Sequence, residues 1–540
     1  MSRCERTVSD TEVCVVGAGP AGALVANRLA SDGHEVTILE AGPRFEERDT
    51  ERMEQALRPG LSDLGVWGMG GPRDAFSTTG RFYPLNSTRV KGVGGSTNHW
   101  QGMVYRLHEA DFAGDNNGPA WPISYADLRP YYLAAERAIG VAGDSENPYA
   151  PPRDEPHPMG AFPPSYSDSL FADACRQVGV TTHSVGNARN SEAYDNRAAC
   201  VGYGTCKPVC PSGARYDATH TIAAAEERGV EVIADAPVQR LDTDASGEQV
   251  TRAVYVREGS QQELTADRFV LAAGGIEIPR LLLLSANESH PDGLANGSGA
   301  VGRYFHEHVF AGTGGRIDEP TRQNHVGFTT SESHQFYDDP GAGTETIPAS
   351  DESLAPFKLE FLNYGGPSGT GQAIVRRALA GDSWGDDLLA ELRESYGNQL
   401  AMGGLVGQPP RAENRIRLDE ETTDDHGNPV PEIQWTLDER TKRTIRRATE
   451  IQRHIFEALG ARIEWQTTPE TTGPAAHHMG TTRMSSDPKS GVVRPDCRTH
   501  EVSNLWVASS SVFPNGGALN PTLTIAALAL SCADSVAESL

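Results

Sequence analysis

The segment TEVCVVGAGPAGALVANRLASDGHEVTILEAG near the start of the chain constrains its fold more than any other stretch. An apolar run is followed at once by Gly17, Gly19 and Gly22, which begin a run of helix-forming residues. A second apolar run then ends in Glu40. Glycines at these positions permit a tight turn, close approach of a pyrophosphate and close packing of a helix on a strand. We therefore expect strand, turn, helix and strand over residues 11–44.

This arrangement predicts a dinucleotide-binding site. The amino end of the expected helix would face the phosphates, where the helix dipole favours negative charge. Glu40 would bind the hydroxyls of a ribose, and a carboxylate there disfavours the 2′-phosphate of NADP. The segment does not decide between NAD and FAD. The alternative is a glycine-rich turn without function, although the strand, the helix and the acid at the end of the second strand all match the dinucleotide-binding pattern.

The two ends of the chain indicate one cofactor domain that a second domain interrupts. Residues 227–275 alternate short β-rich runs, and residues 437–459 have the apolar spacing of an amphipathic helix. The chain ends with a strand, a Gly/Pro turn and a long Ala/Leu helix. We expect an α/β fold (α+β overall), with the cofactor domain at 1–310 and 471–540 and a sheet-based substrate domain at 311–470.

Charge and hydropathy exclude several classes of partner. With 47 Lys and Arg against 73 Asp and Glu, the net charge is −26, which repels nucleic acid and anionic lipid. So acidic a composition is typical of halophilic proteins, because concentrated salt screens like charges from one another. No apolar run reaches the roughly 18 residues of a membrane helix. The first residues, MSRCERTVSDTE, have neither an apolar core nor a twin arginine, so we expect a cytoplasmic protein without an export signal.

Four further blocks, with the glycine motif, resemble the glucose–methanol–choline (GMC) oxidoreductase family in the same chain order. They are TRVKGVGGSTNHWQGM (88–103), VLAAGGIEIPRLLLLS (270–285), VGRYFHEH (301–308) and HHMGTTRM with SSSVFPNGGALNPTLTIAALAL (within 477–530). Within the family the chain is similar to the large subunits of FAD-dependent fructose, gluconate and glucose dehydrogenases, and AENRIRLD and DDHGNPVPEI support this narrower match. The resemblance implies FAD as the cofactor, bound by a Rossmann-like domain.

The resemblance also implies a catalytic pair near the end of the chain. Alcohol oxidation needs a base for the hydroxyl proton and a second polar group that orients the oxygen, while a hydride moves to flavin N5. In the family, the His of an HxxGT segment pairs with a later His or Asn. Here these positions are His477 and Asn520, and His478 is the neighbour that a shift of one residue would select.

The GGSTNHW segment would lie along the flavin, with Gly94, Gly95, Ser96 and Asn98 lining it. It is similar to the GG-xxx-HW segment of pyranose oxidases, in which the His carries the flavin covalently. His99 is therefore a candidate for covalent attachment of FAD. The alternative is that His99 only packs against the ring or hydrogen-bonds to it, because many relatives have Asn here and bind FAD without a covalent bond.

Three further positions follow from the resemblance. Val238 would meet the adenine ring through its backbone. Relatives often place an acid beside the ribityl chain where this sequence has Ser509, whose hydroxyl would substitute for it. The HEH segment at 306–308 lacks the HExxH spacing of a zinc site, so we expect a structural or packing role there rather than a metal.

Three of the eight cysteines, Cys200, Cys206 and Cys210, are spaced C-x5-C-x3-C-P. Several thiolates from one glycine-containing loop are typical ligands of an iron–sulfur cluster. Three cysteines without a local fourth suit a [3Fe-4S] cluster, and the dehydrogenase large subunits carry one on cysteines of this spacing. The alternatives are zinc, which usually takes C-x2–4-C pairs and a fourth ligand, and three inert thiols.

Together these features predict an FAD-dependent dehydrogenase of a sugar, polyol or sugar acid that passes electrons through an Fe–S cluster to a protein or quinone-linked acceptor. The resemblance suggests a small subunit and a cytochrome as partners, through which the protein would associate with a membrane. An oxidase using O2, a lyase with structural FAD and a non-catalytic FAD-binding subunit are the alternatives. The cysteines argue against the first two, and His477 with Asn520 against the third.

Overall fold

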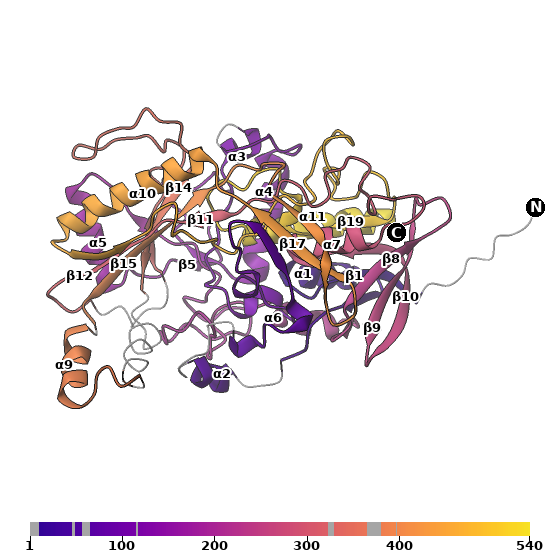
Figure 1. The fold of residues 1–540 in the computed structure, drawn as a ribbon, viewed down its shortest axis with the longest axis horizontal. Helices are drawn as coiled ribbons and strands as arrows, with labels where there is room; N and C mark the ends of the chain where they lie inside the picture. The colour runs from indigo at the N-terminus through magenta and orange to yellow at the C-terminus, as the bar shows by residue number, and fades with distance from the viewer. Residues whose placement is uncertain are drawn as a thin grey trace, which may run out of the picture.

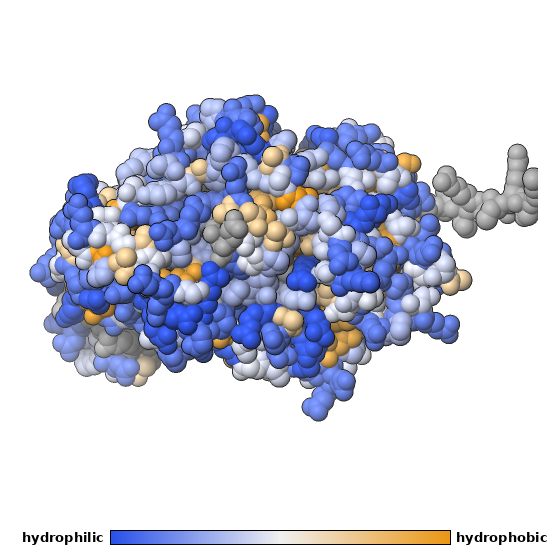
Figure 2. Space-filling view, turned by 90° about the horizontal axis from the view of Figure 1, so that it is seen from above, coloured by the Kyte–Doolittle hydropathy of each residue, from blue (hydrophilic) through white to orange (hydrophobic). Residues whose placement is uncertain are grey.

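The computed structural model describes residues 10–45, 49–56, 65–114, 117–321, 329–363, 378, 380–395 and 397–540. The first nine residues, most of the segment in which we expect no export signal, lie outside this part. Its two largest sheets lie at opposite ends of an elongated molecule (Figure 1). Within the described residues, no helix combines the length and apolarity needed to cross a bilayer. The face in Figure 2 is mainly hydrophilic, with apolar residues in small scattered groups.

The first sheet has the strand order β7-β2-β1-β10-β9-β8, with β19 beside β10. Its strands are β1 (Thr11–Val16), β2 (Val36–Leu39), β7 (Glu231–Ile233), β8 (Val238–Thr243), β9 (Val250–Arg257), β10 (Ser260–Leu271) and β19 (Leu505–Val507). β1 pairs in parallel with β2 and β10, and β19 pairs in parallel with β10. The strand–helix–strand unit predicted over 11–44 is therefore confirmed, and residues from both ends of the chain build one sheet.

Helix α1 (Pro20–Ser31) connects β1 to β2 and packs against the terminal helix α11 (Thr522–Ser539). Pro20 stands in its first turn, where a missing N–H costs nothing. β1 and β2 are apolar and buried along nearly their whole length, as parallel strands covered on both faces must be. The carboxyl ends of these strands and the amino end of α1 therefore meet at one edge of the sheet.

The second sheet has the order β18-β12-β15-β14-β13-β6, with β11 beside β15. Its strands are β6 (His183–Ser184), β11 (His308–Phe310), β12 (Thr313–Arg316), β13 (Ser331–Ser333), β14 (Phe357–Leu362), β15 (Gln399–Gly407) and β18 (Arg462–Gln466). Helices α5 (Tyr166–Gln177) and α10 (Glu439–Ala458) lie against this sheet (Figure 1). Asp438 caps α10 by accepting from two backbone N–H groups, and the amphipathic helix predicted at 437–459 is confirmed.

Smaller elements connect these layers. A three-stranded sheet joins β16 (Arg415–Thr423), β17 (Pro429–Trp435) and β3 (Ser77–Gly80), and β4 (Ala142–Gly143) pairs with β5 (Met159–Gly160). The other α-helices are α2 (Asp49–Ala56), α3 (Glu109–Ala113), α4 (Tyr125–Ile139), α6 (Thr219–Glu226), α7 (Gly274–Leu284) and α9 (Gly385–Ser395). Short 3-10 turns are η1 (Gly65–Trp67), η2 (Pro72–Asp74), η3 (Leu85–Ser87), η4 (Gly95–Asn98) and η6 (Ser510–Val512).

Candidate active site

A cavity of about 2150 Å³, counted with its open mouth, begins at the carboxyl ends of β1 and β2. This is the edge at which open parallel sheets bind their ligands. Most of the residues that the sequence predicts for the site line it: Gly17, Gly19, Glu40, Gly95, Ser96, His99, Val238, His477, Ser509 and Asn520. Three predicted cofactor-binding residues, Gly22, Gly94 and Asn98, do not line the cavity, and neither do the predicted metal ligands Cys200, Cys206 and Cys210.

The three glycines of the first turn have different surroundings. A Cβ atom on Gly22 would stand 1.9 Å from the carbonyl oxygen of Gly17, so only glycine lets α1 approach β1 this closely. Gly17 itself has a φ of +108°, which other residues rarely adopt. A Cβ on Gly19 would meet no protein atom within 4 Å, although Gly19 lines the cavity. Gly22 therefore serves packing, while Gly19 leaves room for a ligand at the amino end of α1.

Glu40 connects the two turns at this edge. Its carboxylate accepts hydrogen bonds from the backbone N–H groups of Ala18 (2.8 Å) and Gly42 (2.9 Å). Burial raises the pKa of Glu40, and the two hydrogen bonds together with Lys91 and Arg73 oppose this shift. The carboxylate thus holds the shape of the cavity wall and remains in contact with the cavity.

Asn98 and Gly94 shape the GGSTNHW segment from behind. The Asn98 amide donates to the carbonyl oxygens of Val93 (3.0 Å) and Gly95 (2.9 Å). Gly94 has a φ of +95°, and a Cβ there would lie 2.9 Å from the Asn98 side chain. These two residues fix the turn η4 without lining the cavity. The residues of the turn that line the cavity include Gly95 and Ser96.

His99 is 7% exposed, and neither of its ring nitrogens has a hydrogen-bond partner among the described residues. Burial, with smaller contributions from the cations Lys207 and Arg215, lowers the pKa of His99 to about 3. The imidazole is therefore neutral at physiological pH and lies at the cavity wall with unsatisfied polar atoms. A buried polar group of this kind needs a partner, and a ligand in the cavity is the available one.

His477 and Asn520 meet at the cavity wall, from segments 43 residues apart in the sequence. The Asn520 amide nitrogen lies 3.5 Å from Nε2 of His477. On its other side, Nδ1 of His477 lies 2.9 Å from Nδ1 of His308, whose Nε2 lies 3.1 Å from the Gly516 carbonyl oxygen. Burial lowers the pKa of both histidines, of His477 to about 3, so both are neutral.

These contacts determine where the protons of the two histidines lie. A carbonyl oxygen only accepts, so Nε2 of His308 donates to Gly516 and its Nδ1 must be an acceptor. The Nδ1 atom of His477 is then the donor in the contact between the two rings. The lone pair of His477 is left on Nε2, beside Asn520. A neutral imidazole with this tautomer is ready to accept a proton at Nε2.

The HEH segment supports His477 from behind. The backbone N–H of His477 donates to the Glu307 carboxylate (2.8 Å), which also accepts from the Tyr83 hydroxyl. Burial raises the pKa of Glu307 to about 8. His478 also lines the cavity, and its Nε2 lies 3.0 Å from the hydroxyl oxygen of Thr88 and 3.9 Å from Oε1 of Glu307. Sequence reasoning expected a packing role for HEH and did not identify the contacts to His477.

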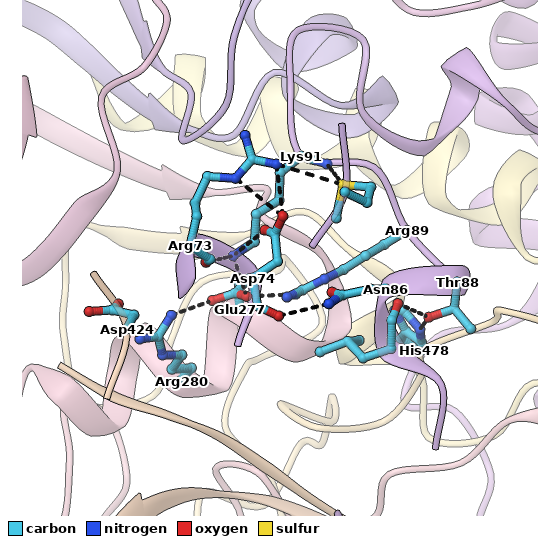
Figure 3. Close-up of polar contacts among 12 residues, drawn as sticks. Arg73, Asp74, Asn86, Thr88, Arg89, Lys91, Glu277, Arg280, Asp424 and His478 are labelled. Atoms are coloured by element: carbon cyan, nitrogen blue, oxygen red, sulfur yellow. Dashed lines mark hydrogen bonds and ion pairs between the residues drawn. The ribbon is translucent and has the colours of Figure 1, made fainter. Parts of the chain in front are cut away.

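A group of charged residues beside the cavity was missed from sequence (Figure 3). It interleaves four cations with three carboxylates: Arg73, Arg89, Lys91 and Arg280 with Asp74, Glu277 and Asp424. Burial alone would raise the pKa of Glu277. The neighbouring cations Lys91, Arg89 and Arg280 outweigh this effect and hold the pKa well below its usual range. The group has one positive charge more than negative, which favours an anionic ligand in the cavity. The only sign of this group in the sequence was the pair of cations Arg89 and Lys91 in the segment TRVK.

Comparison with known proteins agrees with this geometry. Family models described as GMC oxidoreductase match residues 75–310 and 410–529, and a model of an NAD(P)-binding Rossmann-like domain matches residues 15–46. The chain belongs to the GMC oxidoreductase family. It is therefore an FAD-dependent oxidoreductase, and the resemblance and the Rossmann-like α/β fold inferred from sequence are confirmed.

Several GMC relatives are similar over nearly their whole length. The fructose dehydrogenase large subunit of Gluconobacter japonicus is 30% identical over 98% of this chain and 98% of its own. The 2-methyl-1,2-propanediol dehydrogenase of Mycolicibacterium austroafricanum is also 30% identical, over 98% and 96%. A solved structure of formate oxidase from Aspergillus oryzae superposes with a TM-score of 0.66 at 16% identity, covering 99% of both chains, which shows the shared fold.

The cysteine loop lies against the same cavity of this GMC protein. Lys207 lines the cavity, and the Arg215 guanidinium donates to the backbone carbonyls of Cys206 and Asn98. The sulfur atoms of Cys200 and Cys206 lie 3.8 and 3.9 Å from one nitrogen of Arg189.

The backbone N–H of Gly202 donates to the Cys200 sulfur (3.4 Å). In the part of the chain that the structure describes, the three cysteine sulfurs do not converge to within 4.8 Å of one another, as ligands of a single metal ion would; the one such group of three is His183, Glu332 and His334. Within the described residues the three cysteines therefore do not form the kind of compact site that a single ion would occupy.

We predict a pH-dependent stability effect of Glu307→Gln. Because the native pKa of about 8 lies above the unfolded value near 4.3, the native state holds a proton that the unfolded state loses between these pH values. This contribution to the free energy of unfolding is complete below pH 4.3 and is lost as the pH rises through 8. The variant lacks it, so its stability relative to the wild type should increase from pH 5 to pH 8. Urea denaturation across this range measures the difference, and a constant difference would contradict the prediction.

Proposed function

We propose that the protein is a dehydrogenase that oxidises a CH–OH group of a sugar, polyol or sugar acid, with His477 as the base. The observation that carries the proposal is the Nε2 lone pair of His477, which faces the Asn520 amide nitrogen at 3.5 Å, with both residues at the wall of the cavity. The names of the relatives support this class of substrate, since they include dehydrogenases of fructose and of a propanediol.

The residues of the cavity fit FAD. The amino end of α1 with the open space at Gly19 suits the pyrophosphate, and the net positive charge of the Lys91 group suits its two negative charges. We propose that Glu40 binds a ribose, Val238 the adenine and Ser509 the ribityl chain, while Gly95 and Ser96 contact the flavin. Bound FAD supplies the acceptor for the hydride.

The protein's own residues control the proton. The substrate hydroxyl would bind between Nε2 of His477 and the amide N–H of Asn520, where it donates to the first and accepts from the second. His477 takes the proton at Nε2 as the C–H bond breaks. Its Nδ1–H remains directed at His308, and the Glu307 contact to its backbone holds the ring in place. The Asn520 amide then stabilises the charge that develops on the oxygen.

Electron transfer to an acceptor is a further part of the proposal. We propose that Cys200, Cys206 and Cys210 bind a [3Fe-4S] cluster, which would supply one-electron transfer to a protein or quinone-linked acceptor. Two features support this assignment: N–H donors directed at the thiols, which are typical around clusters, and the place of the loop beside the cavity. The fructose dehydrogenase relative is named a large subunit, so we propose a small subunit and a cytochrome as partners of a cytoplasmic chain, which they would bring to a membrane.

We also propose that the FAD domain comprises residues 1–310 and 471–540, and the substrate domain residues 311–470. The first sheet lies wholly within the former. Most of the second sheet lies in the latter, although β6 and β11 enter it from the FAD domain. His308 in β11 thereby connects the second sheet to the base.

We predict that His477→Ala retains FAD but loses on the order of 10²–10⁴-fold in the rate of flavin reduction, the usual contribution of a general base. Asn520→Ala should lose less, because it orients the oxygen rather than accepting the proton. Stopped-flow bleaching of the flavin by a panel of sugars and polyols without oxygen measures both rates. His454→Ala, on α10, is the control.

If His478→Ala abolishes bleaching while His477→Ala does not, the assignment of the base is wrong. Fast H2O2 production in air would favour an oxidase, and an absence of bleaching by any substrate would favour a lyase.

We predict a covalent bond between His99 and FAD. After acid precipitation the yellow colour should stay with the polypeptide, and His99→Ala should release it into the supernatant while FAD remains bound under native conditions. The neutral imidazole with unpartnered nitrogens at the cavity wall is the physical reason. If all flavin of the wild type appears in the supernatant, the covalent bond is excluded.

We predict that Cys206→Ser separates two activities. Flavin reduction by substrate should persist, because His477 and Asn520 are untouched. Reduction of cytochrome c should fall by at least about tenfold, together with iron content and broad visible absorbance. Cys175→Ala, a buried cysteine of α5, is the matched control and should retain both. Unchanged iron and unchanged cytochrome reduction in Cys206→Ser would refute the cluster.

A further inference from the structure

Lys358 is a fully buried cation that the proposed reaction does not yet use. The chain has only five lysines, and this one, in β14, is 0% exposed. Side chains alternate along a strand, so Phe357, Leu359 and Phe361 share one face of β14, where Phe361 stacks on Phe171 of α5 at 4.9 Å. Lys358 and Glu360 are therefore on the opposite face, away from α5.

The ammonium of Lys358 has three polar partners, two through hydrogen bonds and one through an ion pair. Nζ lies 3.1 Å from Oε2 of Glu332, 3.0 Å from Oε1 of Glu360 and 3.0 Å from Oδ1 of Asn520. It also lies 4.0 Å from the centre of the Tyr105 ring. Buried cations need such pairing, and the third partner is the orienting residue of the proposed active site.

Charge balance alone explains two of these contacts. Glu332 of β13 and Glu360 of β14 stand directly opposite each other in the sheet, and like charges so placed destabilise a sheet. An ammonium between them removes the repulsion. The contact to Asn520 is not needed for this purpose, since Asn520 is neutral and lies in a distant segment of the chain, just before α11.

A metal ion is not the better explanation of this group, although His183, Glu332 and His334 bring ligand atoms within 4.8 Å of one another. Nε2 of His183 accepts from the backbone N–H of His334 (3.2 Å), and its Nδ1 lies 3.0 Å from the Ser184 carbonyl oxygen. Nδ1 therefore carries the proton and has no lone pair for a metal. Lys358 already supplies the positive charge beside Glu332.

We propose that Lys358 is the positioning residue that fixes the orientation of the Asn520 amide. An ammonium can only donate, so the amide oxygen must face Lys358 and the amide N–H groups must face His477 and the substrate. In the flipped amide, the oxygen would face the lone pair of His477 and the developing negative charge of the substrate. The inference rests on the proposed function, because it gives Asn520 the role of orienting the substrate oxygen.

The charge of Lys358 gives the inference a second, independent readout. After burial, Lys358 is the largest influence that lowers the pKa of His477, followed by His478. The groups around His477 are His308, Glu307, His478 and Asn520; those around Lys358 are Glu332, Glu360 and Tyr105. Removing this cation should therefore raise the pH at which the base of the free enzyme becomes protonated.

A double-mutant cycle on the holoenzyme tests the inference. In Lys358→Met we expect the rate of anaerobic flavin reduction to fall at least tenfold. In an Asn520→Ala background the same substitution should change the rate less than twofold, because a residue that acts through another loses its effect when that other is absent. The acid limb of kcat/KM should also move to higher pH by about one unit or more. Lys442→Met, on α10, is the control and should change neither quantity.

Lys358→Met leaves two buried carboxylates without their cation, so the cycle is repeated with Lys358→Met/Glu332→Gln, in which one of these charges is also removed. Lys358→Arg, which keeps a cation with donors only, should restore part of the rate. Additive losses, or a folded Lys358→Met enzyme with the normal rate and the normal acid limb, would overturn the inference. If His477→Ala and Asn520→Ala retain full rates, the proposed function fails instead.

Discussion

The parallel pairing of β19 with β10 is the contact on which the rest of the site depends. It joins Phe269–Leu271 to Leu505–Val507, residues more than 230 positions apart, by backbone hydrogen bonds in the centre of the first sheet. The pairing sets the place of η6 and of α11, which packs on α1. Asn520, two residues before α11, is thereby held at the cavity that the first glycine turn begins. The pairing thus places the segment that carries Asn520 on the same sheet as the dinucleotide turn.

The local elements could be predicted from sequence because their causes are local. Apolar runs on either side of spaced glycines predict the β1–α1–β2 unit. The spacing of apolar residues along 437–459 predicts an amphipathic helix. His477 and Asn520 could be named only through family resemblance, since no spacing rule connects residues 43 positions apart. Lys358 and His308 were missed because each acts from a different strand of the second sheet. The one available signal was a lysine within the otherwise largely apolar segment FKLEFL.

The distribution of charge differs between the surface and the site. The chain has a net charge of −26, yet the Lys91 group at the cavity wall has one cation more than carboxylates, and Lys358 is buried behind Asn520 between Glu332 and Glu360. Burial strengthens both, because few waters screen them. In the proposed function the Lys91 group suits the phosphates of the cofactor, while Lys358 acts on the substrate only through the Asn520 amide. The protein can thus hold an anionic cofactor and promote loss of a proton inside an acidic molecule.

The contact between Lys358 and Asn520 also joins the two large sheets mechanically. Lys358 is part of a strand of the second sheet, while Asn520 is anchored by the terminal helix to the first. Their 3.0 Å contact persists only while the sheets keep their relative position. A displacement of about 1 Å at a catalytic group can cost on the order of 100-fold in rate. Loosening of the interface between the sheets, even far from the cavity, would therefore slow the chemistry before it released the cofactor.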